Sequence, residues 1–226
     1  MWIISLLKST ENGINERRRH RYIRTIMEYI DHVFYINLDK RDDRKTHFEQ
    51  VSQEYGLSAE RFSAIECPQQ GILGCGLSHL SVLRLAKERG YKHVLIFEDD
   101  FTFVVSPDTF RENLRRLFSD GPEFDVCMLA FNMRESEPLQ PGFQKACLAH
   151  TASGYLVAAH YYDTLIGLYE WAMRLLEQTG EHWNYANDMV WRDLQKRDRW
   201  IAFSERQGKQ MEGYSDNSYC YRSMDC

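Results

Sequence analysis

Residues Lys92–Asp100, KHVLIFEDD, decide the fold. The apolar residues Val94–Phe97 follow one another without interruption, which is typical of a strand that is buried on both faces. This run leads directly into three acidic residues, Glu98, Asp99 and Asp100. Open α/β sheets bind their ligands at the carboxyl ends of their strands. The triplet therefore predicts a functional site at this edge of the sheet.

The acidic triplet is suited to holding a cation. Because side chains alternate along a strand, Glu98 and Asp100 are expected on one side and Asp99 on the other. Neighbouring carboxylates repel one another unless a cation or a proton lies between them. Oxygen ligands of this kind suit Mg²⁺ or Mn²⁺, ions that commonly share their coordination with substrate phosphates. The alternative is an acidic surface turn that binds nothing.

On both sides of this strand, apolar runs alternate with helical patterns. Strands are predicted at residues 33–38, 61–65, 124–130 and 199–203, with two short ones within 146–159. Helices are predicted at residues 45–56, 77–90, 106–121, 161–178 and 184–197. Loops are expected at the glycine-rich segment 68–76 and at the polar segment 131–145, which is suited to a mobile flap. The alternation predicts an α/β sheet that is covered by helices on both faces.

Composition excludes several classes of protein. The chain has 226 residues, of which 43% are hydrophobic, with 5 Trp, 13 Tyr and 12 Phe, so it is not a disordered polyelectrolyte. Its net charge of -5 argues against a main role in binding nucleic acid, and no nucleic-acid partner is expected. Six cysteines without a Cys-X-X-Cys pair indicate free thiols rather than a zinc site or a disulfide scaffold.

The ends of the chain differ from its centre. Residues 1–30 are expected to form a leader whose basic run, residues 16–24, makes weak contact with a membrane surface or is a solvated helix face. Met27 is an alternative start. Residues 31–217 are expected to form one catalytic domain, and residues 218–226 a tail. No signal peptide or retention signal is recognised, so a cytoplasmic location is expected.

Two further segments carry candidate binding residues. Asn37, Arg41 and Arg44 follow the first predicted strand, where they are placed to meet the phosphates or base of a nucleotide, or else form a mixed-charge helix start. The glycines of residues 71–76 precede a helix, which suggests a phosphate cradle, although their spacing matches neither the Rossmann nor the Walker pattern. His79 near the start of that helix is a ligand or a packing residue.

Six motifs in order resemble those of glycosyltransferase family 25. They are YINLDKRDDR (35–44), GILGCGLSHLSVL (71–83), HVLIFEDD (93–100), TASGYLV (151–157), NDMVW (187–191) and RQGKQMEGYSDN (206–217). That family includes lipooligosaccharide sugar transferases and collagen galactosyltransferase domains. The resemblance covers about residues 32–217, and it departs from the family pattern at Asn217, where isoleucine is usual.

The resemblance implies a GT-A-like fold, which is a Rossmann-related open mixed sheet flanked by helices. It also implies an inverting transfer of a hexose, galactose or glucose, from a UDP-sugar to a hydroxyl of a glycan or a hydroxylated protein. The implied cofactor is Mn²⁺ or Mg²⁺, which Glu98 and Asp100 would hold. The implied general base is Asp188, whose alternative role is a helix N-cap.

The remaining residues implied by the resemblance would contact the donor. They are Asn37, Leu38, Arg41, Arg44, Gly74, Ser78, His79, Asp99, Gln207, Ser215 and Asp216. Two other functions share the carboxylates and the α/β sheet. One is a non-catalytic GT-A-like module that binds a nucleotide or a partner, and the other is a metal-dependent nucleotidyltransferase or phosphohydrolase. The sequence predicts no oligomeric state.

Overall fold

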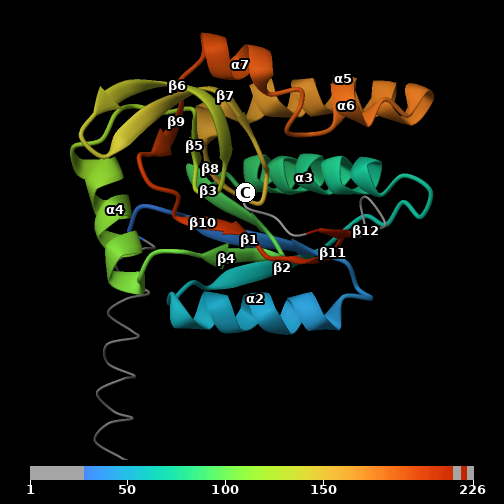
Figure 1. The fold of residues 1–226 in the computed structure, drawn as a ribbon, viewed down its shortest axis with the longest axis horizontal. Coiled ribbons are helices and arrows are strands. Elements are labelled where there is room, and N and C mark those ends of the chain that lie inside the picture. The colour runs from blue at the N-terminus through green and yellow to red at the C-terminus, as the bar shows by residue number, and fades with distance from the viewer. Residues whose placement is uncertain (1–27, 216–219, 223–226) are drawn as a thin grey trace, which may run out of the picture.

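The computed structural model of the protein describes residues 28–215 and 220–222. One mixed sheet of eight strands organises this part of the chain (Figure 1). Its strands lie in the order β2 (Ala59–Ser63), β1 (His32–Asn37), β3 (His93–Glu98), β8 (Gly154–Ala158), β5 (Val126–Met128), β9 (Trp200–Phe203), β7 (Phe143–His150) and β6 (Asn132–Gln140). β1 pairs with β2 and β3 in parallel, and β8 is antiparallel to both its neighbours. The expected open mixed α/β sheet is therefore confirmed.

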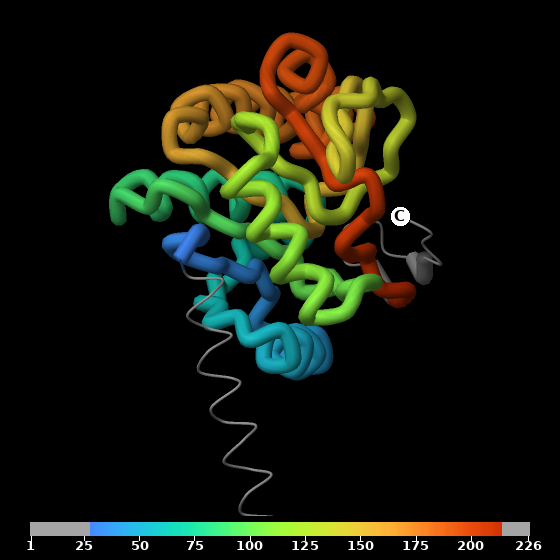
Figure 2. Tube along the Cα trace, turned by 90° about the vertical axis from the view of Figure 1, so that its left-hand side faces the viewer, coloured from blue at the N-terminus to red at the C-terminus, as the bar shows by residue number. Residues whose placement is uncertain are grey.

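Helices cover both faces of this sheet. α3 (Gly71–Glu88), α5 (Tyr162–Thr179) and α7 (Arg192–Arg197) lie over one face, and α2 (Asp42–Glu54) and α4 (Pro107–Ser119) over the other. A 3₁₀ turn, η1 (Ala159–Tyr161), precedes α5, and the short helix α6 (His182–Tyr185) follows it. Figure 2, turned by 90°, also shows α2 and α5 on opposite sides of the molecule.

The central strands are buried because their side chains feed two cores. In β3, Val94 and Ile96 pack into the core under α3 and α5, whereas Leu95 and Phe97 pack into the core under α2 and α4. All four are fully buried. Burial of an aliphatic or aromatic side chain stabilises the fold by roughly 1.5–3 kcal/mol. The uninterrupted apolar run thus reflects a strand with a core on each face.

Two small antiparallel strand pairs lie in the C-terminal part of the chain, and one of them reaches the acidic triplet. β4 (Phe101–Phe103), directly after the triplet, pairs with β10 (Gly208–Gln210). β11 (Gly213–Ser215) pairs with β12 (Cys220–Arg222). The backbone N–H of Met211 donates to the carbonyl of Asp100 at 2.7 Å. Residues 208–211 of the last sequence motif are therefore fixed next to the carboxyl end of β3.

Several predicted helix boundaries are confirmed by their capping residues. The Ser106 hydroxyl accepts from the backbone N–H of Thr109, and Pro107 follows it as the first residue of α4. Gly56 and Gly90, which follow α2 and α3, have φ of +64° and +70°. Glycine adopts this left-handed conformation at little cost, so both residues end their helices as predicted.

Three expected segments differ from the structure. Residues 71–76 are not a loop but the first turns of α3, where the glycines permit close packing. Residues 131–145 are not a flap, because β6 and β7 form a hairpin at the edge of the sheet. The predicted helix 184–197 is interrupted between α6 and α7, and the turns at 187–190 carry Asp188.

Several expectations concern residues outside the described ranges. They are the basic run 16–24, the alternative start at Met27, and the site residue Asp216. Within the described residues, Ile30 is fully buried and Tyr29 stacks on Phe118. No helix among the described residues has the length and apolar character needed to span a bilayer.

Asp125, which precedes β5, binds Arg199, which precedes β9, and His160 of η1. It should therefore contribute to stability. Its carboxylate accepts from the backbone N–H and the guanidinium of Arg199 and pairs with His160. Although burial opposes it, the hydrogen bonds from Arg199 keep the pKa of Asp125 below its usual value of 3.8. A lowered pKa stabilises the fold above the unfolded pKa, and this contribution disappears as the pH falls through the folded pKa.

Asp125→Asn should therefore lower the free energy of unfolding by about 1.5–3 kcal/mol at pH 7, the range for hydrogen bonds to charged groups. The difference from wild type should shrink below pH 4. Urea unfolding at pH 7 and pH 3 measures both effects. Asp163→Asn, which removes an exposed ion pair with Lys87, is the matched control and should cost under about 1 kcal/mol. Equal losses in the two variants would contradict this role of Asp125.

Candidate active site

A cleft of about 500 Å³ opens at the carboxyl ends of β1 and β3. This volume lies within the usual range for small-molecule sites. Its walls come from the β1–α2 loop, the start of α3, the acidic triplet, the turn before β8, the turns after α6, and the segment after β10. The lining residues include Leu38, Arg44, Cys75, Glu98, Asp99, Asp100, Thr151, Asn187, Asp188 and Gln210. The sequence motifs thus converge on one cleft.

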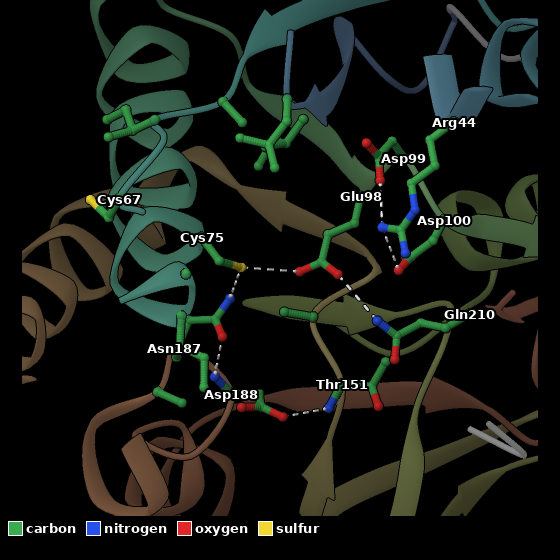
Figure 3. A pocket seen from close by; sticks show the side chains of 18 of the residues that line it. Arg44, Cys67, Cys75, Glu98, Asp99, Asp100, Thr151, Asn187, Asp188 and Gln210 are labelled. Carbon is green, nitrogen blue, oxygen red and sulfur yellow. Dashed lines mark hydrogen bonds and ion pairs between the residues drawn. The ribbon is translucent and has the colours of Figure 1, made fainter. Parts of the chain in front are cut away.

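Glu98 lies at the centre of this site (Figure 3). One carboxylate oxygen, Oε1, accepts from His79 Nε2 at 3.1 Å and from the Cys75 thiol at 3.5 Å. The other, Oε2, accepts from Gln210 Nε2 at 3.2 Å. Although burial opposes it, the hydrogen bond from His79 lowers the pKa of Glu98. Glu98 is therefore ionised and held from both sides.

Asp99 and Asp100 share one guanidinium. Arg44 Nη1 lies 3.0 Å from Asp99 Oδ1 and 3.1 Å from Asp100 Oδ2 (Figure 3). Asp99 Oδ2 also accepts from Asn37 Nδ2 at 2.7 Å. The predicted alternation does not apply beyond Glu98, because β3 ends there and the next two residues form a turn. This turn is why Arg44 reaches both aspartates.

The site carries more negative charge than its guanidinium balances. Burial, followed by the charge of Glu98, raises the pKa of Asp100 to about 7. Burial likewise raises the pKa of Asp99. When all three carboxylates are ionised, one Arg44 leaves two negative charges, which a divalent cation would neutralise.

The residues present fit such a cation. Asp100 Oδ1 is buried and has no hydrogen-bond partner among the described residues. Glu98 Oε2 has only the amide of Gln210. Hard divalent ions such as Mn²⁺ and Mg²⁺ take carboxylate oxygens of this kind. Glu98 and Asp100, the pair expected from the sequence, thus lie in the same cleft and offer suitable ligand atoms.

A second group of potential ligands adjoins the first. Cys75, His79 and Glu98 each place one ligand atom within 4.8 Å of the others. Burial, followed by the charge of Glu98, raises the pKa of the Cys75 thiol well above its usual value. Cys75 is therefore a neutral thiol that donates to Glu98, which argues against a thiolate nucleophile.

Three residues that were predicted to contact the sugar donor do not line the cleft but lie behind it. They are Gly74, Ser78 and His79. Ser78 Oγ accepts from the backbone N–H of Ile65 at 2.8 Å and donates to the carbonyl of Gly74. His79 is fully buried against Glu98. A Cβ on Gly74 would lie 2.4 Å from the carbonyl oxygen of Ile65. Gly74 and Ser78 therefore bind the segment around Ile65, which lines the cleft, to α3.

Gly74→Ala should consequently destabilise the protein. The added methyl group meets backbone rather than a flexible side chain, and overpacking of this kind costs about 1–3 kcal/mol. Gly167→Ala, at an exposed position of α5 with no atom within 4 Å of the new Cβ, is the control and should stabilise by about 0.5–1 kcal/mol. Thermal unfolding followed by circular dichroism compares the two. A Gly74→Ala protein as stable as wild type would refute this packing role.

Asp188 lies in the turns between α6 and α7, on a different part of the cleft wall. Its Oδ2 accepts from the backbone N–H of Thr151 at 3.0 Å, and its own N–H donates to Asn187 Oδ1. Thr151 has φ of +87°, a rare conformation for a residue with a β-branched side chain. Such strain is typical of functional sites and is held here by Asp188. Asp188 is not the N-cap of a helix.

The other predicted residues divide between the cleft and its surroundings. Asn37 is buried behind the cleft, where it holds Asp99 and accepts from Arg61. Arg41 pairs with Asp43 and does not line the cleft. Gln207 is buried and accepts from Asn113, away from the lining. Ser215 belongs to β11.

Gln210 is the contact that the sequence reasoning missed. It stands three residues after Gln207 in the same motif and donates to Glu98. Its place on β10, which pairs with β4 directly after the triplet, brings it to the cleft. The motif itself contained the signal, but the pairing of β4 with β10 could not be read from it. His150 and Asn132 also line the cleft and were not predicted.

Comparisons with known proteins agree with the resemblance. The chain is 26% identical to a glycosyltransferase 25 family member of Drosophila melanogaster over 56% of this chain, and 28% identical to one of Drosophila pseudoobscura pseudoobscura over 48%. These matches cover only 25% and 22% of the relatives, so the chain spans about a quarter of their length. No family model matches the chain. The resemblance to glycosyltransferase family 25 is nevertheless confirmed.

The fold is also found in a solved glycosyltransferase structure. A glycosyltransferase involved in the glycosylation of the major capsid of PBCV-1 superposes with a TM-score of 0.51 at 11% identity. The match covers 83% of this chain and 95% of that one. At this identity the likeness establishes the fold alone, and it confirms the GT-A-like α/β expectation.

Proposed function

We propose that this relative of glycosyltransferase family 25 is a metal-dependent enzyme that transfers a hexose, galactose or glucose, from a UDP-sugar to an acceptor hydroxyl. The observation that carries the proposal is the cleft itself. It combines a carboxylate group suited to a divalent cation, formed by Glu98 and Asp100, with a separate carboxylate, Asp188. A glycan or a hydroxylated protein would supply the hydroxyl.

The donor end of the cleft is the acidic triplet with Arg44. Glu98 and Asp100 would hold Mn²⁺ or Mg²⁺, which when bound neutralises the charge that develops on the departing diphosphate. Arg44, fixed by Asp99 and Asp100, presents a guanidinium beside the same position. Guanidinium groups bind phosphate oxygens through paired N–H donors. Leu38 contributes apolar surface to this part of the wall.

The acceptor end of the cleft contains Asp188. In an inverting transfer, the acceptor oxygen attacks the anomeric carbon while the bond from that carbon to the UDP oxygen breaks. The proton of the hydroxyl passes to Asp188, and the electron pair of the broken bond leaves on UDP. The N–H of Thr151 fixes one oxygen of Asp188, which orients the other.

A donor screen tests this function. The full chain is incubated with Mn²⁺ and one UDP-sugar at a time, with and without glycan and hydroxylated-peptide acceptors, and UDP release is measured. We expect acceptor-dependent release from UDP-galactose or UDP-glucose that ethylenediaminetetraacetate abolishes. Hydrolysis of the UDP-sugar to UMP and sugar 1-phosphate would indicate a phosphohydrolase, transfer of UMP to the acceptor with release of sugar 1-phosphate a nucleotidyltransferase, and metal-dependent UDP binding without turnover a non-catalytic module. Each of these three outcomes would overturn the proposal.

A further inference from the structure

A line of buried hydrogen bonds leads from the centre of the protein to Glu98. Trp191 Nε1 donates to the hydroxyl of Tyr169 at 3.0 Å. Tyr169 and Tyr155 lie in the same core, where the polar groups of each influence the pKa of the other. Tyr155 Oη lies 2.8 Å from His79 Nδ1, and His79 Nε2 lies 3.1 Å from Glu98 Oε1. These four side chains, Trp191, Tyr169, Tyr155 and His79, are called the relay below.

Counting donors and acceptors fixes the direction of these hydrogen bonds. An indole nitrogen can only donate, so the Tyr169 oxygen accepts from Trp191. An ionised Glu98 can only accept, so His79 carries its proton on Nε2 and donates it to Glu98. His79 Nδ1 is then an acceptor, and the Tyr155 hydroxyl donates to it. All four side chains are fully buried, where an unsatisfied hydroxyl is costly, so this arrangement is favoured.

We infer that Tyr155 is a positioning residue that holds the ring of His79 from the nitrogen opposite Glu98 and thereby fixes the orientation of Glu98. The inference rests on the proposed function, in which Glu98 holds the cation. With Oε1 engaged by His79 and Cys75, Oε2 is the oxygen that faces the ligand. Partners that lie behind a ligating carboxylate commonly contribute 10–100-fold to metal affinity or activity.

The relay also argues against a metal bound by nitrogen and sulfur. The cluster Cys75, His79 and Glu98 would bind a soft ion such as Zn²⁺ only through the lone pair of His79 Nε2. That lone pair requires the proton on Nδ1, which would leave the proton of a buried tyrosine hydroxyl without an acceptor. His79 therefore supports Glu98 and is not a metal ligand, and the cation would be bound by carboxylate oxygens.

The first measurement reads the tautomer of His79 directly. In the full chain labelled with ¹⁵N-histidine, long-range ¹H–¹⁵N spectra distinguish Nε2–H from Nδ1–H, and His79→Gln identifies the signal. We expect Nε2–H in wild type, and in Tyr155→Phe an Nδ1 signal that shifts because the hydrogen bond at that nitrogen is lost, while the ionised Glu98 keeps the proton on Nε2. An Nδ1–H form in wild type, or an unchanged Nδ1 signal in Tyr155→Phe, would overturn the inference. This measurement needs no donor, acceptor or metal.

The second measurement reads the effect on Glu98. Binding of Mn²⁺ alone, followed by electron paramagnetic resonance of the free ion, should be about 10-fold weaker in Tyr155→Phe. Tyr161→Phe is the matched control, because Tyr161 also accepts from a buried indole, Trp200, but donates to Asp198, away from the cleft. Its Mn²⁺ affinity should equal that of wild type. Equal affinities in wild type and Tyr155→Phe would refute the positioning role.

The two measurements distinguish the proposed metal-dependent function from the positioning role of the relay. A wild-type protein that binds no Mn²⁺ but shows the Nε2–H tautomer would contradict the metal-dependent function while the relay stands. Tyr169→Phe provides a second variant if Tyr155→Phe does not fold. It removes the acceptor of Trp191 but leaves the Tyr155 hydroxyl, so its loss of Mn²⁺ affinity should be smaller than that of Tyr155→Phe. A larger loss would contradict the stated order of the relay.

Discussion

Asp100→Asn should reduce the proposed hexose transfer by about 10²–10³-fold while the protein remains folded, because the loss of one group that stabilises developing charge costs this much in other enzymes. The substitution keeps the size of the side chain and removes one of the two carboxylates that face the proposed cation. Asp100 Oδ2 pairs with Arg44, but Asp100 Oδ1 has no hydrogen-bond partner among the described residues, so one carboxylate oxygen remains for the proposed cation. UDP release and Mn²⁺ affinity should fall together.

The folded state should tolerate this change. Asp100 is buried close to Glu98, and a neutral amide removes the repulsion between the two carboxylates. We expect a melting temperature at least equal to that of wild type without divalent ions. Asp99→Asn is the informative comparison, because Asp99 accepts from both Asn37 and Arg44 and its loss should lower stability. Transfer at the wild-type rate by Asp100→Asn would eliminate the proposed cation site.

The sequence predicted the parts of the fold whose contacts are local or doubly buried. β1 and β3 were recognisable because cores on both faces require continuous apolar runs. β6 was not, because it is an edge strand whose residues 134–139 are exposed and include charged side chains and Pro138. Edge strands carry charges and proline to avoid unwanted pairing, so their composition resembles that of a loop.

The glycines at the start of α3 were misread for a related reason. A glycine-rich segment before a helix suggests a phosphate cradle, but here Gly74 faces the carbonyl of Ile65 and Gly76 faces Met173 of α5. Glycine was needed for close packing between elements, and that need depends on partners 9 and 97 residues away in sequence. No local pattern distinguishes such a packing glycine from a ligand-binding one.

The candidate site was also predicted only in part. The acidic triplet and Arg44 were identified from residue type and strand position, and the structure brings them into contact. The relay behind Glu98 was not identified, because the sequence does not distinguish Tyr155, Tyr169 and Trp191 from ordinary core aromatic residues. Their polar atoms meet only when β8, α5 and the turn before α7 pack together.

Asp188→Asn should lower the turnover number by about 10²–10⁴-fold, the usual contribution of a general base. The Michaelis constant for the UDP-sugar should change little, because the donor contacts lie at the acidic triplet. Steady-state rates with a saturating acceptor measure both constants. Asp193→Asn, an exposed acid in the first turn of α7, is the control and should behave as wild type.

A structural role for Asp188 predicts the same loss, since its carboxylate also holds Thr151 at a φ of +87°. The two roles separate in a double variant. Glycine adopts positive φ without strain, so Thr151→Gly removes the need for Asp188 to hold this turn. If Asp188 takes the proton of the acceptor, Thr151→Gly should retain activity, and Asp188→Asn combined with Thr151→Gly should remain as inactive as Asp188→Asn. Recovery of transfer in the double variant would assign Asp188 to the turn and leave the base to another residue.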